Sequence, residues 1–98
     1  MNKKLIFTKK ADEQLTALES DSSQKRILKD VRKTLGLMET NLRHPSLQTH
    51  EFKSFKGPNG EKVFEAYAQQ KTPGAYRIFW HYGPGKNDLT IIAIVSHP

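Results

Sequence analysis

The stretch VFEAYAQQKTPGAYRIFWHYGPGKNDLTIIAIVSHP, residues 63–98, decides the fold. Three segments in it, 63–70, 75–82 and 89–96, are rich in apolar and aromatic residues, as β-strands are, and turns containing Pro and Gly separate them. Short turns between consecutive strands favour antiparallel pairing. The last segment is apolar on both faces, which predicts a position inside the sheet with both faces covered.

The middle strand has two unlike faces, because successive side chains of a strand point to opposite sides. One face carries Tyr76, Ile78, Trp80 and Tyr82, and the other carries Arg77, Phe79 and His81. We expect the first face to lie in the core. An arginine inside an apolar strand is costly unless its charge has a partner or faces a groove. Arg77 therefore marks the second face as a candidate site.

The N-terminal half predicts one strand and two helices. Residues 4–8 (KLIFT) favour a strand, and Thr8 can cap a helix over residues 9–18. A second helix is expected from just after Asp21 to near Asn41. Its apolar stripe is Ile27, Leu28, Val31, Leu35 and Met38, and its opposite face carries Lys25, Arg26, Lys29, Arg32 and Lys33.

Residues 42–61 show no regular pattern and are expected to form a loop that Phe52 and Phe55 anchor to the core. The resulting order is strand, helix, helix and three strands. We therefore predict one α+β domain over residues 1–98, in which a helical hairpin packs on a mainly antiparallel four-stranded sheet. A chain of 98 residues has room for one core.

Charge and composition narrow the classes of partner. The formal net charge is +6 and the pI is near 9.7, which favours polyanions such as RNA, DNA or an acidic protein. The absence of cysteine excludes disulfides and thiolate metal sites and fits a cytoplasmic location. No apolar run approaches the roughly 20 residues that cross a membrane, so no membrane partner is expected.

The chain resembles the RelE/ParE toxin superfamily, the toxin halves of bacterial toxin–antitoxin pairs. The resemblance lies in the layout and in three segments: HPSLQTHEFKSFKG (44–57), GAYRIFWHY (74–82) and IIAIVSHP (91–98). The middle strand of the family typically has a Tyr-Arg pair followed by an aromatic residue, which Tyr76 and Arg77 match. Its last strand typically ends in a functional basic residue or histidine, which His97 matches.

The resemblance implies two alternative activities. RelE-like members are ribonucleases that cut messenger RNA, often in the ribosomal decoding site, whereas ParE-like members poison DNA gyrase without a nuclease site. A third alternative is a fold relative that has lost toxicity. Both toxic types are neutralised by an antitoxin, so the expected partners are an antitoxin protein and either mRNA, with or without the ribosome, or a protein such as gyrase.

For a ribonuclease, the residues suggest roles that need no cofactor or metal. Arg77 can hold a phosphate with its planar fork, and His97 can move protons near neutral pH. Glu65 or His81 would assist as a base or acid. The residues expected to bind RNA are Lys25, Arg26, Lys29, Arg32, Lys33 and Lys71.

Each of these assignments has a structural alternative. Arg77 can instead pair with Glu65 on the neighbouring strand. His97 can be a residue of a frayed chain end with no functional role. His81 can be a half-buried strand residue with no catalytic role. The basic helix face can be simply solvated. The family's catalytic members also carry extra basic or acidic residues before the Tyr-Arg pair, or a tyrosine after the last histidine, where this chain has Pro98.

Overall fold

The structure is a computed structural model that describes residues 2–97. Met1 and Pro98 lie outside the described residues, and so does the position at which the family's catalytic members carry a tyrosine and this chain carries Pro98. The elements in chain order are β1 (Lys4–Phe7), α1 (Lys9–Ser20), the 3₁₀ turn η1 (Ser22–Gln24), α2 (Lys25–Thr40), the 3₁₀ turn η2 (Pro45–Leu47), β2 (His50–Lys56), β3 (Lys62–Tyr67), β4 (Tyr76–Tyr82) and β5 (Asp88–Ser96). None of the described helices has the length and apolar character needed to span a membrane.

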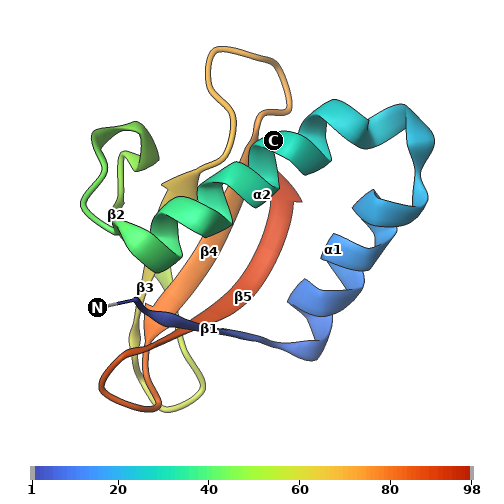
Figure 1. Ribbon diagram of the computed structural model, residues 1–98. Coiled ribbons are helices and arrows are strands. Elements are labelled where there is room, and N and C mark those ends of the chain that lie inside the picture. The colour runs from blue at the N-terminus through green and yellow to red at the C-terminus, as the bar shows by residue number, and fades with distance from the viewer. Residues whose placement is uncertain (1, 98) are drawn as a thin grey trace.

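The strands form one five-stranded sheet in the order β1-β5-β4-β3-β2 (Figure 1). β1 runs parallel to β5, and the other neighbours are antiparallel. The predicted α+β class and the three C-terminal strands are confirmed. The prediction of four strands was wrong, because residues 50–56 were assigned to a loop and form the edge strand β2. As predicted, β5 lies inside the sheet, between β1 and β4.

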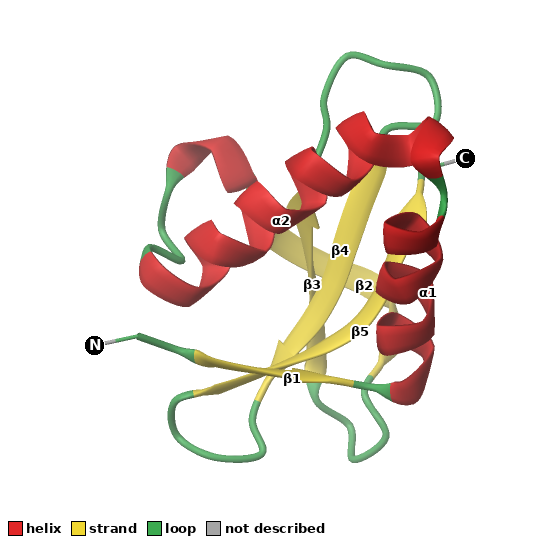
Figure 2. Cartoon of the chain, turned by 45° about the vertical axis from the view of Figure 1, so that its right-hand side comes forward, coloured by secondary structure: helices red, strands yellow, loops and turns green. Residues whose placement is uncertain are grey.

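Both helices lie on one side of the sheet, with α1 along β5 and α2 crossing it (Figure 2). Thr8 caps α1 by accepting a hydrogen bond from the Ala11 N–H at 3.1 Å, and its hydroxyl donates to the Ile92 carbonyl at 3.0 Å. One side chain therefore satisfies a free helix N–H and ties the start of α1 to the last strand.

The core lies between the helices and the sheet. The predicted stripe of α2 supplies Val31, Leu35 and Met38, and β4 supplies Ile78 and Trp80, all buried. Phe64 stacks on Trp80 with ring centroids 5.0 Å apart. The expectation that the Trp80 side of the strand faces the core is confirmed. The opposite side of the sheet carries Arg77 and is covered by neither helix (Figure 2). It is called the open face below.

A cluster of three phenylalanines covers the centre of the open face. Phe52 and Phe55 of β2 lie 4.9 and 6.1 Å from Phe79 of β4, measured between ring centroids. They reach it because the register of β2 against β3 shifts between Glu51 and Lys56, and such an irregularity bends and twists a strand. The two phenylalanines do anchor their segment, but to the open face rather than to the core beneath the helices.

Candidate functional site

Glu65 and Arg77 form a buried ion pair on the open face. Their side chains are 7 % and 11 % exposed, and Glu65 Oε2 lies 3.7 Å from Arg77 Nε. The register places Glu65 opposite Phe79, and Tyr67 opposite Arg77, so the pair runs diagonally across two antiparallel strands. The alternative that Arg77 pairs with Glu65 is thus what the structure contains. Burying either charge alone would cost hydration free energy, and the attraction between the carboxylate and the guanidinium offsets part of that cost.

The guanidinium of Arg77 is held on three sides. Its Nη1 donates to the Gln69 carbonyl at 2.9 Å and makes longer contacts with the carbonyls of Ala75 and Tyr76 at 3.4 and 3.3 Å. Its central carbon lies 3.7 Å above the ring of Tyr67, a cation–π contact. Within residues 2–97, all hydrogen bonds of the guanidinium are donated by Nη1 and none by Nη2. Nη2 is therefore the atom that can donate to a bound anion.

His50 and Glu65 are in hydrogen-bond contact across β2 and β3. The Nδ1 of His50 lies 2.9 Å from the Gln48 carbonyl, which can only accept, so Nδ1 carries hydrogen. The Nε2 lies 2.7 Å from Glu65 Oε1, and a contact that short between these atoms requires a hydrogen between them. That proton belongs either to an imidazolium beside a carboxylate or to a carboxylic acid beside a neutral imidazole.

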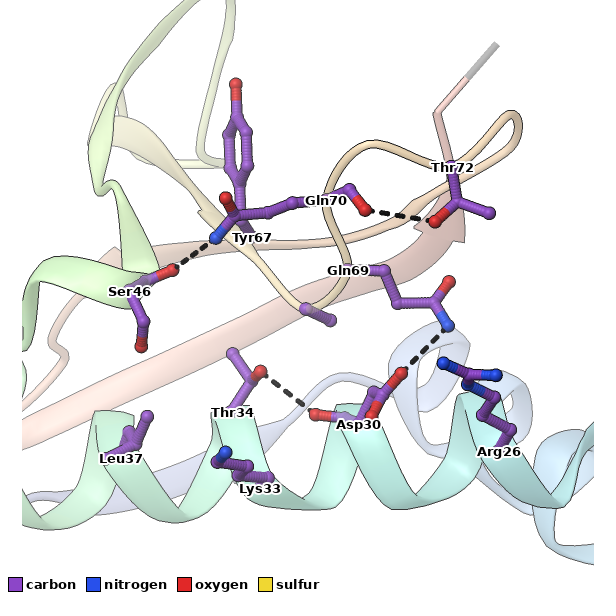
Figure 3. A pocket seen from close by; sticks show the side chains of 11 residues that line it. Arg26, Asp30, Lys33, Thr34, Leu37, Ser46, Tyr67, Gln69, Gln70 and Thr72 are labelled. Carbon is purple, nitrogen blue, oxygen red and sulfur yellow. Dashed lines mark hydrogen bonds between the residues drawn. The ribbon is translucent and has the colours of Figure 1, made fainter.

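The loop between β3 and β4 positions Arg77 from the side of α2. The side chain of Gln69 donates to Asp30 Oδ2 of α2 at 3.0 Å and accepts from the Tyr76 N–H at 3.2 Å. Figure 3 shows the bond between Gln69 and Asp30 across a cavity beneath this loop. Because the carbonyl of the same glutamine accepts from Arg77, one residue links α2 to the guanidinium.

His97 lies at the Arg77 end of the sheet. Its backbone N–H donates to the Ala75 carbonyl at 2.7 Å, the carbonyl that Arg77 Nη1 also contacts at 3.4 Å. Val95 pairs with Arg77 in register, and His97 follows Val95 by two residues, so strand alternation continued past the end of β5 places both on the open face. The structure therefore brings the predicted residues Arg77, Glu65 and His97 to one end of one face.

His81 lies away from that end, although it shares the face and the strand. Phe79 stands between His81 and Arg77, and four residues of strand separate their Cα atoms by about 13 Å. His81 is buried, and its Nδ1 donates to the Tyr82 carbonyl at 2.7 Å. The pKa of Glu61 is lowered mainly by the Asn59 N–H that its carboxylate accepts, and in smaller part by His81. Phe79, with Phe52 and Phe55 packed against it, lies between His81 and Arg77, so His81 does not join the residues at the Arg77 end.

The predicted RNA-binding residues of α2 are all exposed, but they do not form a uniform surface. Arg32 pairs with Glu19 of α1 at 3.0 Å. Arg26 and Lys33 instead line the cavity of about 470 Å³ beneath the β3–β4 loop, together with Asp30 (Figure 3). Lys71 lies on that loop and is exposed, with a positive φ of 60°.

Sequence reasoning missed His50 as a site residue, because its segment was assigned to a loop. The signal that could have found it is weak: in HEFKSFK, residues 50–56, alternate positions 50, 52 and 54 would share a face. Within residues 2–97, no three or more His, Asp or Glu side chains gather closely enough to hold a metal ion. This end of the open face thus combines the hydrogen-bonded side chains of His50 and Glu65 with the guanidinium of Arg77, and His97 lies nearby.

Comparisons with known proteins give structural likeness only. No family model and no curated protein sequence matches the chain. The solved structure of a YoeB/ParE toxin from Agrobacterium tumefaciens superposes with a TM-score of 0.66 at 11 % identity, covering 97 % of this chain and 99 % of that one. The YoeB dimer from Staphylococcus aureus gives 0.66 at 14 % identity, with both chains covered in full.

A third similar structure is the archaeal RelE–RelB complex from Pyrococcus horikoshii, whose matching chain gives a TM-score of 0.64 at 12 % identity. The match covers 98 % of this chain and 96 % of that chain. All three matches run over nearly the whole length of this chain. The protein therefore shares the fold of these YoeB/ParE and RelE toxin structures.

Proposed function

We propose that this protein is the toxin of a bacterial toxin–antitoxin pair and that it cleaves messenger RNA by acid–base chemistry at the open face. The observation that carries the proposal is the juxtaposition of Arg77, with Nη2 left to donate, and the hydrogen-bonded pair of Glu65 and His50. A neighbour solved as a RelE–RelB complex supports an antitoxin as the protein partner. In this proposal the protein acts in the cytoplasm, on RNA alone or within the ribosome.

The proposed reaction is attack by the 2′-oxygen of the RNA on its own phosphate. His97 takes the proton of the 2′-hydroxyl, the oxygen bonds to phosphorus, and the bond from phosphorus to the 5′-oxygen breaks. The pair of Glu65 and His50 gives a proton to that leaving oxygen. The products are a 2′,3′-cyclic phosphate and a 5′-hydroxyl end. Arg77 Nη2 binds the phosphate oxygens whose charge grows in the transition state.

A second candidate function is a toxin of the ParE type, which inhibits a protein target such as DNA gyrase without chemistry of its own. One observation favours it: the side chain of Arg77 is only 11 % exposed, and most of its contacts are with Glu65 and with backbone carbonyls. Such contacts suit a structural arginine. Under this candidate the ion pair stabilises the sheet, and another surface binds the target.

Inducible expression in a bacterial host separates the two candidates. We would follow growth and map new 5′-hydroxyl ends in cellular RNA for the wild type and for Glu65→Gln, His50→Gln and His97→Gln. Glu13→Gln, on the exposed side of α1, is the matched control for loss of a carboxylate. The ribonuclease proposal expects growth arrest and new ends with the wild type and the control, and loss of both with His50→Gln.

The decisive comparison is between soluble variants, checked by circular dichroism and thermal unfolding. Growth arrest without new RNA ends contradicts the ribonuclease and supports a protein target. RNA cleavage that persists at wild-type rate in both His50→Gln and His97→Gln contradicts the assigned roles. In purified form, an RNA with a 2′-deoxy sugar at the cut site must resist cleavage, because the attacking oxygen is missing.

A further inference from the structure

A second cavity, of about 580 Å³, lies at the other end of β4 from Arg77. Most of its lining comes from the segment that joins α2 to β2, namely Leu42, Arg43, His44, Pro45, Gln48 and Thr49. Lys3, near the N-terminus, and Tyr82, at the end of β4, complete the lining. The cavity is large enough for a small ligand. Five residues of strand, about 17 Å, separate Tyr82 from Arg77, so it is distinct from the site described above.

Among the described residues, the lining of this cavity is basic and contains no acidic side chain. Lys3 and Arg43 form no ion pair with any residue in the described part of the chain. In the cavity beneath the β3–β4 loop, by contrast, Asp30 stands among the cations. The second cavity therefore has the stronger attraction for an anion.

His44 is oriented to donate a hydrogen bond. Its Nδ1 accepts the backbone N–H of Ser46 at 3.1 Å, which caps η2. A nitrogen that accepts carries no hydrogen, so the neutral ring has its proton on Nε2. The ring is thereby fixed with its remaining N–H available as a donor. His44 and Arg43 are adjacent in the chain, so two donors come from one short segment.

Tyr82 supplies an aromatic surface beside these donors. It is 51 % exposed, whereas Trp80 on the same face of β4 is fully buried. The ring of Tyr82 is held by edge contacts with Trp80 and Phe64, at centroid distances of 4.9 and 5.6 Å. A ring that is held on one side and exposed on the other is a preformed platform for stacking, because little side-chain freedom is lost when a planar ligand binds.

We propose that this cavity binds a nucleotide, with the base stacked on Tyr82 and the phosphate held by Arg43 and Lys3. Cations for a phosphate, an aromatic ring for a base and the lack of a repelling carboxylate are the features that single-stranded nucleotide sites combine. The nucleotide can be free or part of an RNA strand, because the recognised groups are the same. The inference goes beyond the proposed cleavage reaction and does not depend on it.

The test is an NMR titration of the purified protein, following backbone amides, with adenosine 5′-monophosphate, adenosine and inorganic phosphate as separate probes. We expect the monophosphate to shift the amides of Arg43, Thr49 and Tyr82 and to bind at least about tenfold more tightly than adenosine or phosphate alone. Tyr82→Leu should weaken binding by roughly 5- to 100-fold, the loss typical of one stacked base. Tyr82→Phe, which keeps the ring, should bind like the wild type.

Arg43→Gln tests the phosphate contact at an exposed residue, and Lys10→Gln, at an exposed position of α1 outside both cavities, is its control. We expect weaker binding of the monophosphate with Arg43→Gln only. A hexa-adenylate that binds more tightly, with a salt dependence that Arg43→Gln reduces, assigns the site to a strand; equal affinity assigns it to a free nucleotide. The proposal is overturned if these amides do not shift, if Tyr82→Leu binds as the wild type does, or if an acidic peptide binds there and no nucleotide does.

Discussion

The pair of Glu65 and Arg77 should contribute more to stability than the pair of Glu19 and Arg32, although its atoms are farther apart. The buried pair is separated by 3.7 Å with side chains 7 % and 11 % exposed; the surface pair is separated by 3.0 Å with side chains 41 % and 59 % exposed. At an effective dielectric constant of about 20, the Coulomb attraction at 3.7 Å is about 4.5 kcal/mol. Water screens the surface pair far more strongly.

Two double-mutant cycles measure this difference by urea unfolding. One uses Glu65→Gln and Arg77→Met, and the other uses Glu19→Gln and Arg32→Met, so that the chemical changes match. Part of the buried attraction is offset by lost hydration and by the lack of a hydrogen bond at Arg77 Nε. We therefore expect a coupling energy of about 2 kcal/mol for the buried pair and less than about 1 kcal/mol for the surface pair.

The single variants and salt provide further checks. Glu65→Gln alone should cost about 3 kcal/mol, because it leaves the buried guanidinium without a carboxylate. In 1 M salt the coupling of Glu19 and Arg32 should fall toward zero, while that of Glu65 and Arg77 should largely remain. A coupling energy for the buried pair no larger than that for the surface pair would refute the reasoning, since burial would then not strengthen the interaction.

Four other substitutions test the fold. Met38→Ala removes a fully buried side chain and should lower the free energy of unfolding by about 2–5 kcal/mol in urea titrations. Gly36→Ala, within α2 and with no atom near the new Cβ, should raise the melting temperature, whereas Gly83→Ala, at a φ of +101°, should lower it; equal effects would contradict the backbone argument. The pKa of Asp21 is lowered by the hydroxyl and N–H of Ser23, so its contribution to stability is present above the unfolded pKa and is lost as pH falls through the folded pKa. Asp21→Asn should therefore flatten the acid side of the curve of unfolding free energy against pH.

Local patterns in the sequence were sufficient for most of the architecture. Turn residues such as Gly83 separated the strands, and the spacing of Val31, Leu35 and Met38 identified the buried side of α2. Alternation along β4 assigned Trp80 to the core and Arg77 to the opposite face. These signals work because a helix or strand repeats its orientation every few residues, so a single segment records which side is buried.

β2 escaped prediction because an edge strand has little of that signal. Its residues are mostly exposed, and its register against β3 shifts after Glu51. Charged residues such as Lys53 and Lys56 suit an exposed edge, since they discourage unwanted pairing, but they also make the segment resemble a loop. The strand forms because β3 offers an unpaired edge, which is a property of the sheet and not of residues 50–56.

The sequence by itself determined the α+β class, the basic net charge, and the position of Arg77 on the face of β4 away from the core. Only the tertiary structure decided which groups Arg77 meets. The pairing of β2 with β3 places His50 opposite Glu65, although the two residues are 15 positions apart in the sequence. The register of β3 against β4 places Glu65 diagonally across from Arg77, so that its carboxylate reaches the guanidinium. Contacts of this kind depend on strand register, which is set by the packing of the whole sheet and leaves no periodic trace in any single segment.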